Sequence, residues 1–254
     1  MTSKIKEYYR YNLGKGVAAF STGRDTDHPD DPYGGFNACH YTHGNPQEVA
    51  ACRSMLYNAL PGLRELVIPR QTHSLNVALI DSCPVGDLED VDALVTALPG
   101  VAIAVNTADC VPVLMADPVA GVIAAVHSGW RGTVGHIAVK AVDVMEQAGA
   151  QRERISVAMG PSICTGCFEV GPEVADVFDN EYPDVRDIVF RTGGELPHID
   201  LRNAIVHDLV EIGIHRVNID SSAPCSRCNW TEWWSARRMG INSGRTLSLV
   251  MLQK

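Results

Sequence analysis

The 254-residue chain lacks long hydrophobic runs and segments of biased composition. No apolar stretch approaches the length of about 18 residues that a membrane-spanning helix needs, so we expect no membrane partner. Residues 1–16 carry charged and aromatic side chains but no apolar core of signal-peptide length. Nothing resembles a linker, and the chain is long enough to bury a large core. We therefore expect one domain over residues 1–254 and a cytoplasmic protein.

Positive charge and paired imidazoles are also scarce. The 21 lysines and arginines are outnumbered by 30 aspartates and glutamates, which gives a formal net charge of -9. This balance argues against nonspecific nucleic-acid binding, which depends on a basic surface. The nine histidines include no His-x-His pair, whereas multicopper oxidases hold several copper ions with many imidazoles, commonly in such pairs. The sequence therefore disfavours both of these function classes.

Cysteine, in contrast, is present eight times, and four of these residues form two Cys-x-x-Cys pairs. In a chain of this size without a signal peptide, we expect the thiols to be reduced. Cys164/Cys167 and Cys225/Cys228 together have the composition of a closed four-cysteine zinc site. The pairs lie farther apart than in the compact ribbons and knuckles that this motif usually marks. We expect loop or core thiols there, with a zinc site as the alternative.

Three apolar runs of strand length surround two side chains that can bind a metal. Residues 101–105, 113–116 and 122–126 are continuous apolar segments, which is typical of a sheet that is buried on both faces. Cys110 lies in the polar break between the first two runs, and His127 directly follows the third. Side chains at strand ends on a rigid scaffold are well placed to converge.

His73 is a third candidate ligand, at the end of the Arg70-Gln71-Thr72-His73 segment. Two imidazoles and a thiolate without a fourth protein ligand are typical of a catalytic zinc centre, because the fourth position stays open to water or substrate. The sequence therefore predicts a zinc enzyme with the ligands His73, Cys110 and His127.

Helical periodicity is found in three segments. Apolar spacing predicts a helix over residues 47–60. A second helix is predicted over residues 134–145, with Thr133 as its N-cap. A third is predicted over residues 201–212, ending before Gly213. Helices that alternate with apolar strands indicate a mixed α/β fold.

A long segment without periodicity precedes the first helix. Residues 21–46 are rich in Gly, Pro, Asp and His, which predicts a surface loop. Loops of this length are often functional. His40 and His43 lie within it, and we interpret them as solvated loop residues, with metal binding as the alternative.

Two residues beside the predicted ligands are further candidates. Arg131 lies near the amino end of the 134–145 helix, where unpaired backbone N–H groups favour a bound anion such as phosphate, and the alternative is a surface ion pair. Asp109 precedes Cys110 and is a candidate acid/base or a residue that orients a ligand. A turn-forming aspartate is the equal alternative at that position.

Four segments are more specific than these patterns. They are Asp92-Ala93-Leu94-Val95-Thr96, Thr107-Ala108-Asp109-Cys110-Val111-Pro112-Val113-Leu114, His127-Ser128-Gly129-Trp130-Arg131-Gly132-Thr133 and Gly160-Pro161-Ser162-Ile163. They closely resemble the bacterial YfiH-like family, and the likeness covers nearly the whole chain, from Asn37 to Arg245. Members of that family are described as laccase-domain proteins, polyphenol oxidases, peptidoglycan editing factors and multifunctional purine nucleoside phosphorylases.

The resemblance implies a fold, a metal site and a substrate class. The implied fold is a single α/β (α+β) domain, YfiH/CNF-like, with mixed β-sheets and helices packed outside. The implied metal is zinc on His73, Cys110 and His127, and the implied reactions are phosphorolysis of adenosine, inosine and methylthioadenosine and deamination of adenosine. Departures from the family pattern at Ser128, residues 36–40 and residues 164–167 leave the metal ligands intact and concern substrate preference. The candidates for binding substrate or phosphate are then Arg131, Arg53 and Asn37.

The leading hypothesis is a zinc-dependent purine nucleoside enzyme whose partners are free nucleosides and phosphate, with copper as the alternative metal. Zinc lowers the pKa of bound water to about 7, which would supply hydroxide for deamination. A second hypothesis is a cysteine hydrolase with Cys110 as nucleophile and His127 as base. His73 discriminates between the two, because only the metal site needs it. A copper-dependent polyphenol oxidase and a noncatalytic binding protein are the remaining alternatives.

Overall fold

The computed structural model describes residues 7–24, 26–82, 88–191 and 196–253. Within these ranges the longer strands form two mixed sheets. The first sheet contains, in spatial order, β1 (Glu7–Arg10), β2 (Val17–Thr22), β13 (Thr246–Leu252), β6 (Val101–Thr107) and β3 (Glu65–Val67). The second contains β12 (Ile219–Asp220), β9 (Ser156–Met159), β7 (Val111–Asp117), β8 (Val122–Ser128), β5 (Ala93–Thr96) and β4 (Val77–Ile80).

Both sheets combine parallel and antiparallel pairs. In the first sheet β13 runs antiparallel to β2 and β6, whereas β3 runs parallel to β6. In the second, β7 is antiparallel to both β8 and β9, whereas β4 and β5 are parallel to each other. The mixed sheets expected from the family resemblance are therefore confirmed.

The two sheets pack face to face, and this packing explains why residues 122–126 of β8 are continuously apolar. Ile123 and Ala125 pack in the core between the sheets, together with Ile103 of β6. Ala124 and Val126 point the other way and pack in the core beneath the outer helices. Because both faces of residues 122–126 are buried, the side chains that alternate between the two faces are all apolar. The prediction of a sheet that is buried on both faces is confirmed for this strand.

The three predicted strand runs do not share one sheet. β6 belongs to the first sheet, while β7 and β8 belong to the second. The chain passes from one sheet to the other through residues 108–110, which lie between β6 and β7. Burial on both faces hides the alternation that would have assigned each strand to a layer. The crossing places Cys110 at the edge where the sheets meet.

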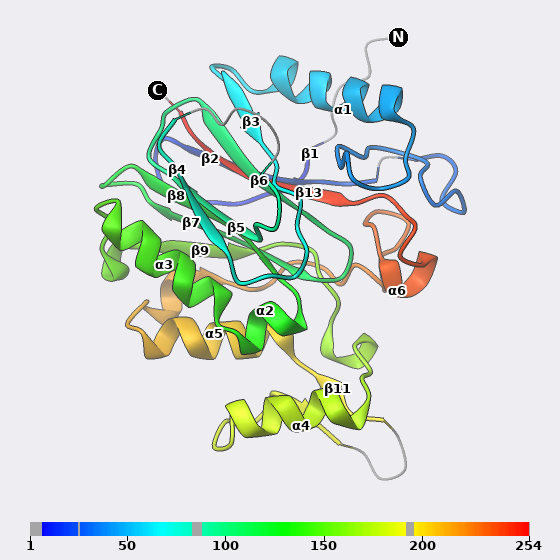
Figure 1. Cartoon of the computed structure of the whole chain (residues 1–254), viewed down its shortest axis with the longest axis vertical. Coiled ribbons are helices and arrows are strands. Elements are labelled where there is room, and N and C mark those ends of the chain that lie inside the picture. Colours follow the sequence, from blue (N-terminus) through cyan, green and yellow to red (C-terminus); the bar gives the residue numbers. More distant parts are fainter. Residues whose placement is uncertain (1–6, 25, 83–87, 192–195, 254) are drawn as a thin grey trace.

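Helices cover both outer faces of this pair of sheets (Figure 1). α1 (Pro46–Ala59) packs on the first sheet, and α3 (Ile137–Gln147) and α5 (Leu201–Glu211) pack on the second. The helices predicted over residues 47–60 and 201–212 are confirmed. Asn45 caps α1, Asp200 caps α5, and Gly213 follows α5 with a φ of 97°. α4 (Pro172–Glu181) and the hairpin of β10 (Val189–Phe190) and β11 (His198–Ile199) lie beyond α5.

Most of the helix predicted over residues 134–145 is present, but a break at residues 135 and 136 interrupts its amino end. α2 (Trp130–Val134) ends at Gly135, and α3 begins after His136, which adopts the left-handed conformation with a φ of 56°. The prediction that Thr133 caps a helix is wrong, because Thr133 lies inside α2 and its hydroxyl donates to the carbonyl of Gly129. The break is held by the His136 ring, which bonds to carboxylates of α4 and α5.

The long loop is shorter at its amino end than predicted. Residues 21 and 22 complete β2, and the described residues from 23 to 45 contain no helix or strand. No helix within the described ranges combines the length and the apolar character needed to cross a bilayer.

Candidate active site

Three side chains from distant segments converge at the sheet edge. His73 lies between β3 and β4, Cys110 lies in the crossing between β6 and β7, and His127 is the penultimate residue of β8. Their ligand atoms all lie within 4.8 Å of one another. Cys110 Sγ lies 3.6 Å from His73 Nε2, and the two imidazole centroids are 4.8 Å apart. The structure therefore brings the three predicted metal ligands together as one His/Cys cluster.

Gly129 makes room for this cluster. A Cβ atom at Gly129 would lie 2.8 Å from His73 Cδ2 and 3.0 Å from Cys110 Sγ. Side-chain atoms do not tolerate such contacts, so any larger residue here would displace two of the three ligands. The glycine of the His127-Ser128-Gly129 segment is thus explained by close packing against the candidate metal ligands.

A buried carboxylate holds both histidines. Asp92 Oδ1 lies 2.6 Å from His127 Nδ1 and also accepts the backbone N–H of His73 at 3.1 Å. Its Oδ2 accepts from the backbone N–H groups of Thr72 and Ser74 and from the Ser74 hydroxyl. Because Asp92 occupies Nδ1 of His127, the Nε2 atom is the nitrogen left to bind a metal. Sequence reasoning quoted Asp92 only as part of a family segment and missed this role.

The cluster contains strongly interacting charges. Burial raises the pKa of Cys110, but the adjacent imidazoles of His127 and His73 outweigh it and lower this pKa to about 6. Burial lowers the pKa of His127, but Cys110 and the hydrogen bond to Asp92 outweigh it and raise this pKa to about 9. Asp92 is shifted in the same manner: burial opposes its ionisation, yet His127 and Ser74 lower its pKa to about 2. The sulfur is therefore held as a thiolate, which is the form that binds metals.

Two left-handed residues give the segments beside the ligands their shape. His73 has a φ of 63° and Asp109 has a φ of 89°. This conformation is uncommon outside glycine, and it tends to persist where the surroundings fix it. Asp109 is fixed by both carboxylate oxygens, because Oδ1 accepts from the Ser226 hydroxyl at 2.7 Å and Oδ2 accepts from the Arg237 backbone N–H at 2.6 Å.

The cluster opens into a pocket of about 560 Å³. This volume lies within the range of about 300–1,000 Å³ that is typical of small-molecule sites. Asn106 Oδ1 is buried, and no described residue gives it a hydrogen-bond partner. The candidate pocket is lined by Tyr41, Gln71, His73, Asn106, Ala108, Asp109, Cys110, His127, Ile163, Phe168, Ala236, Arg237, Ile241 and Arg245.

Two arginines from the carboxyl-terminal quarter of the chain supply positive charge to this pocket. Arg237 donates from its side chain to the carbonyl of Glu169, and Arg245 donates to the carbonyls of Ile241, Ser243 and Gly244. Within the part of the chain that the structure describes, neither guanidinium lies within ion-pair distance of a carboxylate. Both residues lie within the family-like region that extends to Arg245, but the sequence assigned them no role, because nothing local places them near His73.

The three residues that were predicted to bind substrate or phosphate do not line the pocket. Arg131 is exposed, and its guanidinium stacks 4.2 Å over the Trp130 ring. Arg53 donates to the Ala38 carbonyl and contacts His40 Nδ1 at 2.6 Å. Asn37 is buried, and its side-chain oxygen accepts the backbone N–H of Arg245 at 3.2 Å, which places it behind a pocket residue.

The cysteine pairs form a second cluster. We expected loop or core thiols there, with a zinc site as the alternative, and the Sγ atoms of Cys164, Cys167, Cys225 and Cys228 all lie within 4.8 Å of one another, as that alternative requires. Among the described residues, two groups of side chains have ligand atoms close enough to hold a metal ion. They are this four-cysteine cluster and the His/Cys cluster. Neither His40 nor His43 belongs to them.

Comparisons with known proteins agree in family and in fold. A family model described as multi-copper polyphenol oxidoreductase laccase matches residues 18–253. Adenosine deaminase RL5, from an unknown prokaryotic organism, is 47% identical over 92% of this chain and 93% of its own. A purine nucleoside phosphorylase from Bacteroides thetaiotaomicron is 36% identical over 94% of this chain and 92% of its own. The crystal structure of Bacillus licheniformis YfiH superposes with a TM-score of 0.84 at 25% identity, over 93% of each chain.

Proposed function

We propose that this protein, which belongs to the YfiH-like family, is a purine nucleoside enzyme that uses zinc. The family model that it matches is described as multi-copper polyphenol oxidoreductase laccase. The proposed reactions are phosphorolysis of adenosine, inosine and methylthioadenosine, and deamination of adenosine. Two relatives that match more than nine-tenths of this chain support this choice, since one is named adenosine deaminase and the other purine nucleoside phosphorylase.

The observation that carries the proposal is an open three-ligand cluster inside a pocket that also contains positive charge. His73 is exposed, so the cluster is accessible from the pocket side. Structural zinc sites are usually closed by four protein ligands, whereas catalytic sites keep a position for water or substrate. Arg237 and Arg245 both line this pocket, and guanidinium groups can attract phosphate.

The ligand set suits zinc. One thiolate and two imidazoles bind zinc or copper far better than magnesium or calcium. When bound, zinc with an open position supplies Lewis acidity and lowers the pKa of water to about 7. His73, Cys110 and His127 would hold the ion, and Gly129 leaves space beside them.

Two carboxylates, Asp92 and Asp109, position segments that carry the candidate ligands, and Asn106 lines the pocket. Asp92 fixes the ring of His127 and the backbone of His73, so both imidazoles are preorganised. We assign Asp109 as a positioning residue, because both of its oxygens already accept hydrogen bonds from pocket segments. The unpartnered Asn106 Oδ1 can accept from a nucleoside hydroxyl or amino group, which makes Asn106 a substrate-binding candidate.

Incubation of the purified protein with adenosine, with and without phosphate, tests this function. Adenine and ribose 1-phosphate that form only with phosphate indicate phosphorolysis, and inosine that forms in either condition indicates deamination. A parallel Cys110→Ala preparation detects contaminating enzymes, because it should lose both activities. Absence of every product from the zinc-loaded wild-type protein would overturn the proposal.

We predict that Arg237→Ala raises the apparent KM for phosphate by about 10- to 100-fold. This is the effect of losing one charge-assisted hydrogen bond, which contributes about 1.5–3 kcal/mol. Arg131→Ala is the matched control, because Arg131 stacks on Trp130 and does not line the pocket. Steady-state kinetics at varied phosphate compare the two variants. A larger effect at Arg131 than at Arg237 would return the phosphate site to the amino end of α2.

A cysteine hydrolase is the second candidate. The specific observation in its favour is the paired charge of Cys110 and His127, which resembles an activated thiolate with an imidazolium. The position of His73, 3.6 Å from the same sulfur, favours the metal, because a hydrolytic pair needs no second imidazole. A polyphenol oxidase with several copper ions is disfavoured, because the second ligand group in the described ranges consists of four cysteines and contains no histidine.

A further inference from the structure

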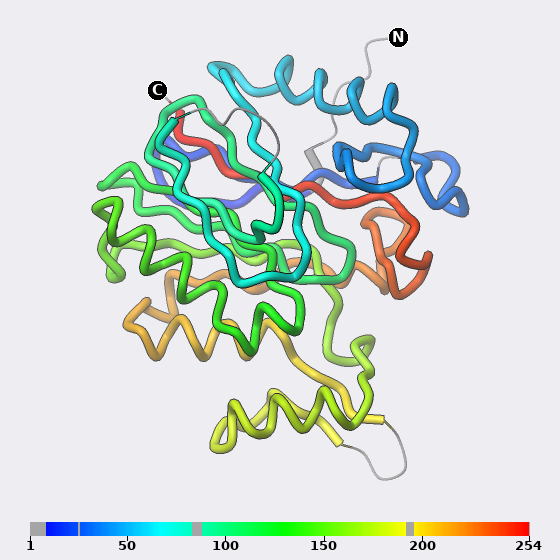
Figure 2. Tube along the Cα trace, in the orientation of Figure 1, coloured from blue at the N-terminus to red at the C-terminus, as the bar shows by residue number. Residues whose placement is uncertain are grey.

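The four-cysteine cluster lies beside the candidate pocket. None of the four cysteines lines this pocket, but Ile163 and Phe168, which adjoin Cys164 and Cys167, do. Cys164 precedes the short turn η2 (Thr165–Cys167), which ends at Cys167, and Cys225 and Cys228 lie in a turn 61 positions farther along. Figure 2 shows the two segments, in yellow-green and orange, reaching the same side of the molecule. A short parallel bridge between Ser162 and Cys225 aligns them.

The separations suit one tetrahedral ion. A zinc ion with Zn–S bonds of about 2.3 Å places its four sulfurs about 3.8 Å apart. All four sulfurs here lie within 4.8 Å of one another, and the Cys167 and Cys228 sulfurs are 3.4 Å apart. One ion at the centre therefore needs only small movements of the side chains.

The backbone is arranged to support a thiolate. Cys225 Sγ accepts the backbone N–H of Cys164 at 3.3 Å and that of Cys228 at 3.4 Å. Each of these donors belongs to another cysteine of the cluster, so the two Cys-x-x-Cys segments wrap around the same sulfur. Hydrogen bonds of this kind orient a metal ligand and stabilise its charge.

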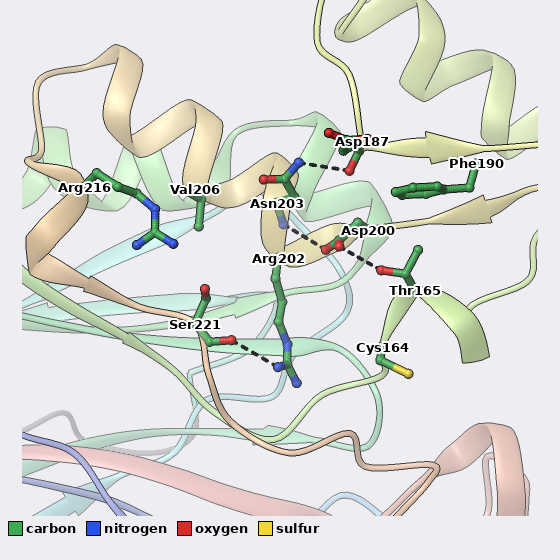
Figure 3. Close-up of a pocket in the computed structure, with 10 residues that line it drawn as sticks. All are labelled: Cys164, Thr165, Asp187, Phe190, Asp200, Arg202, Asn203, Val206, Arg216 and Ser221. Carbon is green, nitrogen blue, oxygen red and sulfur yellow. Dashed lines mark hydrogen bonds between the residues drawn. The ribbon is translucent and has the colours of Figure 1, made fainter.

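Cations surround the cluster. Arg227 and Arg238 line the same hollow as Cys167 and Cys228. On the other side the largely buried Arg202 reaches from α5 toward Ser221, with Cys164 on the adjacent segment (Figure 3). These guanidinium groups offset the net negative charge of one divalent ion with four thiolates.

We propose that Cys164, Cys167, Cys225 and Cys228 bind a structural zinc ion in a closed four-thiolate site. The thiolates fill all four positions of a tetrahedral ion, so this site leaves none for substrate. The site is separate from the His/Cys cluster, and it stands whether or not the protein acts on nucleosides.

The proposed ion joins two segments that both hydrogen-bond to Asp109, a residue that lines the candidate pocket. Ser226, between two of the cysteines, donates to Asp109, and the backbone N–H of Ile163, next to Cys164, donates to the Asp109 carbonyl. The Arg237 backbone N–H donates to the same carboxylate. A zinc ion at the cysteines would therefore fix the surroundings of Asp109, the residue before Cys110.

Metal analysis of two substitutions at one position tests the site. We expect about two zinc ions per chain in the wild-type protein and about one in Cys228→Ser. Cys228→His should retain about two, because three thiolates and one imidazole also form closed zinc sites. Cys228 is exposed, so neither change disturbs the core. Cys52→Ala controls for the loss of a thiol elsewhere, in α1, and should retain both ions.

Cobalt substitution and intact mass give further readouts, and those made on the wild-type protein do not depend on the folding of a variant. Wild-type protein loaded with Co²⁺ should show the intense visible bands of a tetrahedral four-thiolate ion, and Cys228→Ser should lack that component. Equal zinc content in wild type and Cys228→Ser would overturn the proposal. So would iron in place of zinc in the native protein. Two disulfides, detected as the loss of four hydrogens by mass spectrometry without reductant, would also overturn it.

Discussion

Replacing Cys110 with alanine should remove about one zinc ion per chain and lower nucleoside turnover by more than about 100-fold. The basis for this magnitude is that loss of a residue that only orients a metal ligand typically costs 10- to 100-fold in affinity or activity, so loss of the ligand itself should cost more. Elemental analysis and the adenosine assay measure the two effects. Cys52→Ala removes a buried thiol in α1 and should change neither. A full zinc complement in Cys110→Ala would contradict the assignment.

Alkylation extends the same prediction to the competing hydrolase. A zinc-bound Cys110 should react slowly with iodoacetamide and faster after chelation, with activity following zinc content. A nucleophilic Cys110 should instead react quickly in zinc-loaded protein and lose activity whatever the metal content. Peptide mapping at Cys110 distinguishes these outcomes, and it keeps this thiol separate from those of the four-cysteine cluster.

Asp92→Asn should weaken zinc binding by about 10- to 100-fold and destabilise the fold by on the order of 3 kcal/mol. Each oxygen of Asp92 accepts from at least two donors, so an amide group in either orientation faces N–H or O–H groups. If the amide nitrogen faces His127 Nδ1, the proton of that ring moves to Nε2, the atom needed for the metal. Chelator competition and urea unfolding measure the two effects.

Asp90→Asn is the control for this substitution. Asp90 is exposed and accepts hydrogen bonds from Thr72 and Asn76. It is close to Asp92 in the sequence but lies outside the buried part of the site that Asp92 occupies. Its substitution should change stability by less than about 1 kcal/mol and leave zinc affinity unchanged. Equal effects at the two positions would indicate that Asp92 acts through general surface charge and not through its bonds to the histidine segments.

The sequence predicted the strands around Cys110 and His127 well because their burial is nearly continuous. That same burial concealed the division between two sheets, since a strand that is apolar on both faces carries no alternation to read. The division of the 134–145 helix depends on bonds from His136 to Glu181 and Asp208, which lie far away in the sequence.

Parts of the candidate site were not predictable for a similar reason. Arg237 and Arg245 reach the pocket only because β13 pairs with β6, which places the carboxyl-terminal segment beside Asn106. The two Cys-x-x-Cys pairs were judged by their separation along the chain, and the bridge from Ser162 to Cys225 makes that separation irrelevant. Arg131, in contrast, lies near His127 in the sequence, but it stacks on Trp130 outside the pocket lining.

The hydrogen bonds that Asp92 accepts from the two histidine segments also constrain the order in which the protein folds. The donors from Thr72 to Ser74 and the ring of His127 reach one carboxylate only after β5 has paired with β8. Closing the loop between Asp92 and His127, which are 35 residues apart, costs chain entropy before any long-range contact compensates for it. We therefore expect these contacts to form late in folding. The His/Cys cluster should therefore be completed with the sheet and cannot serve as its nucleus. Zinc would then enter a chain that is already folded, and its rate of uptake should follow access through the pocket.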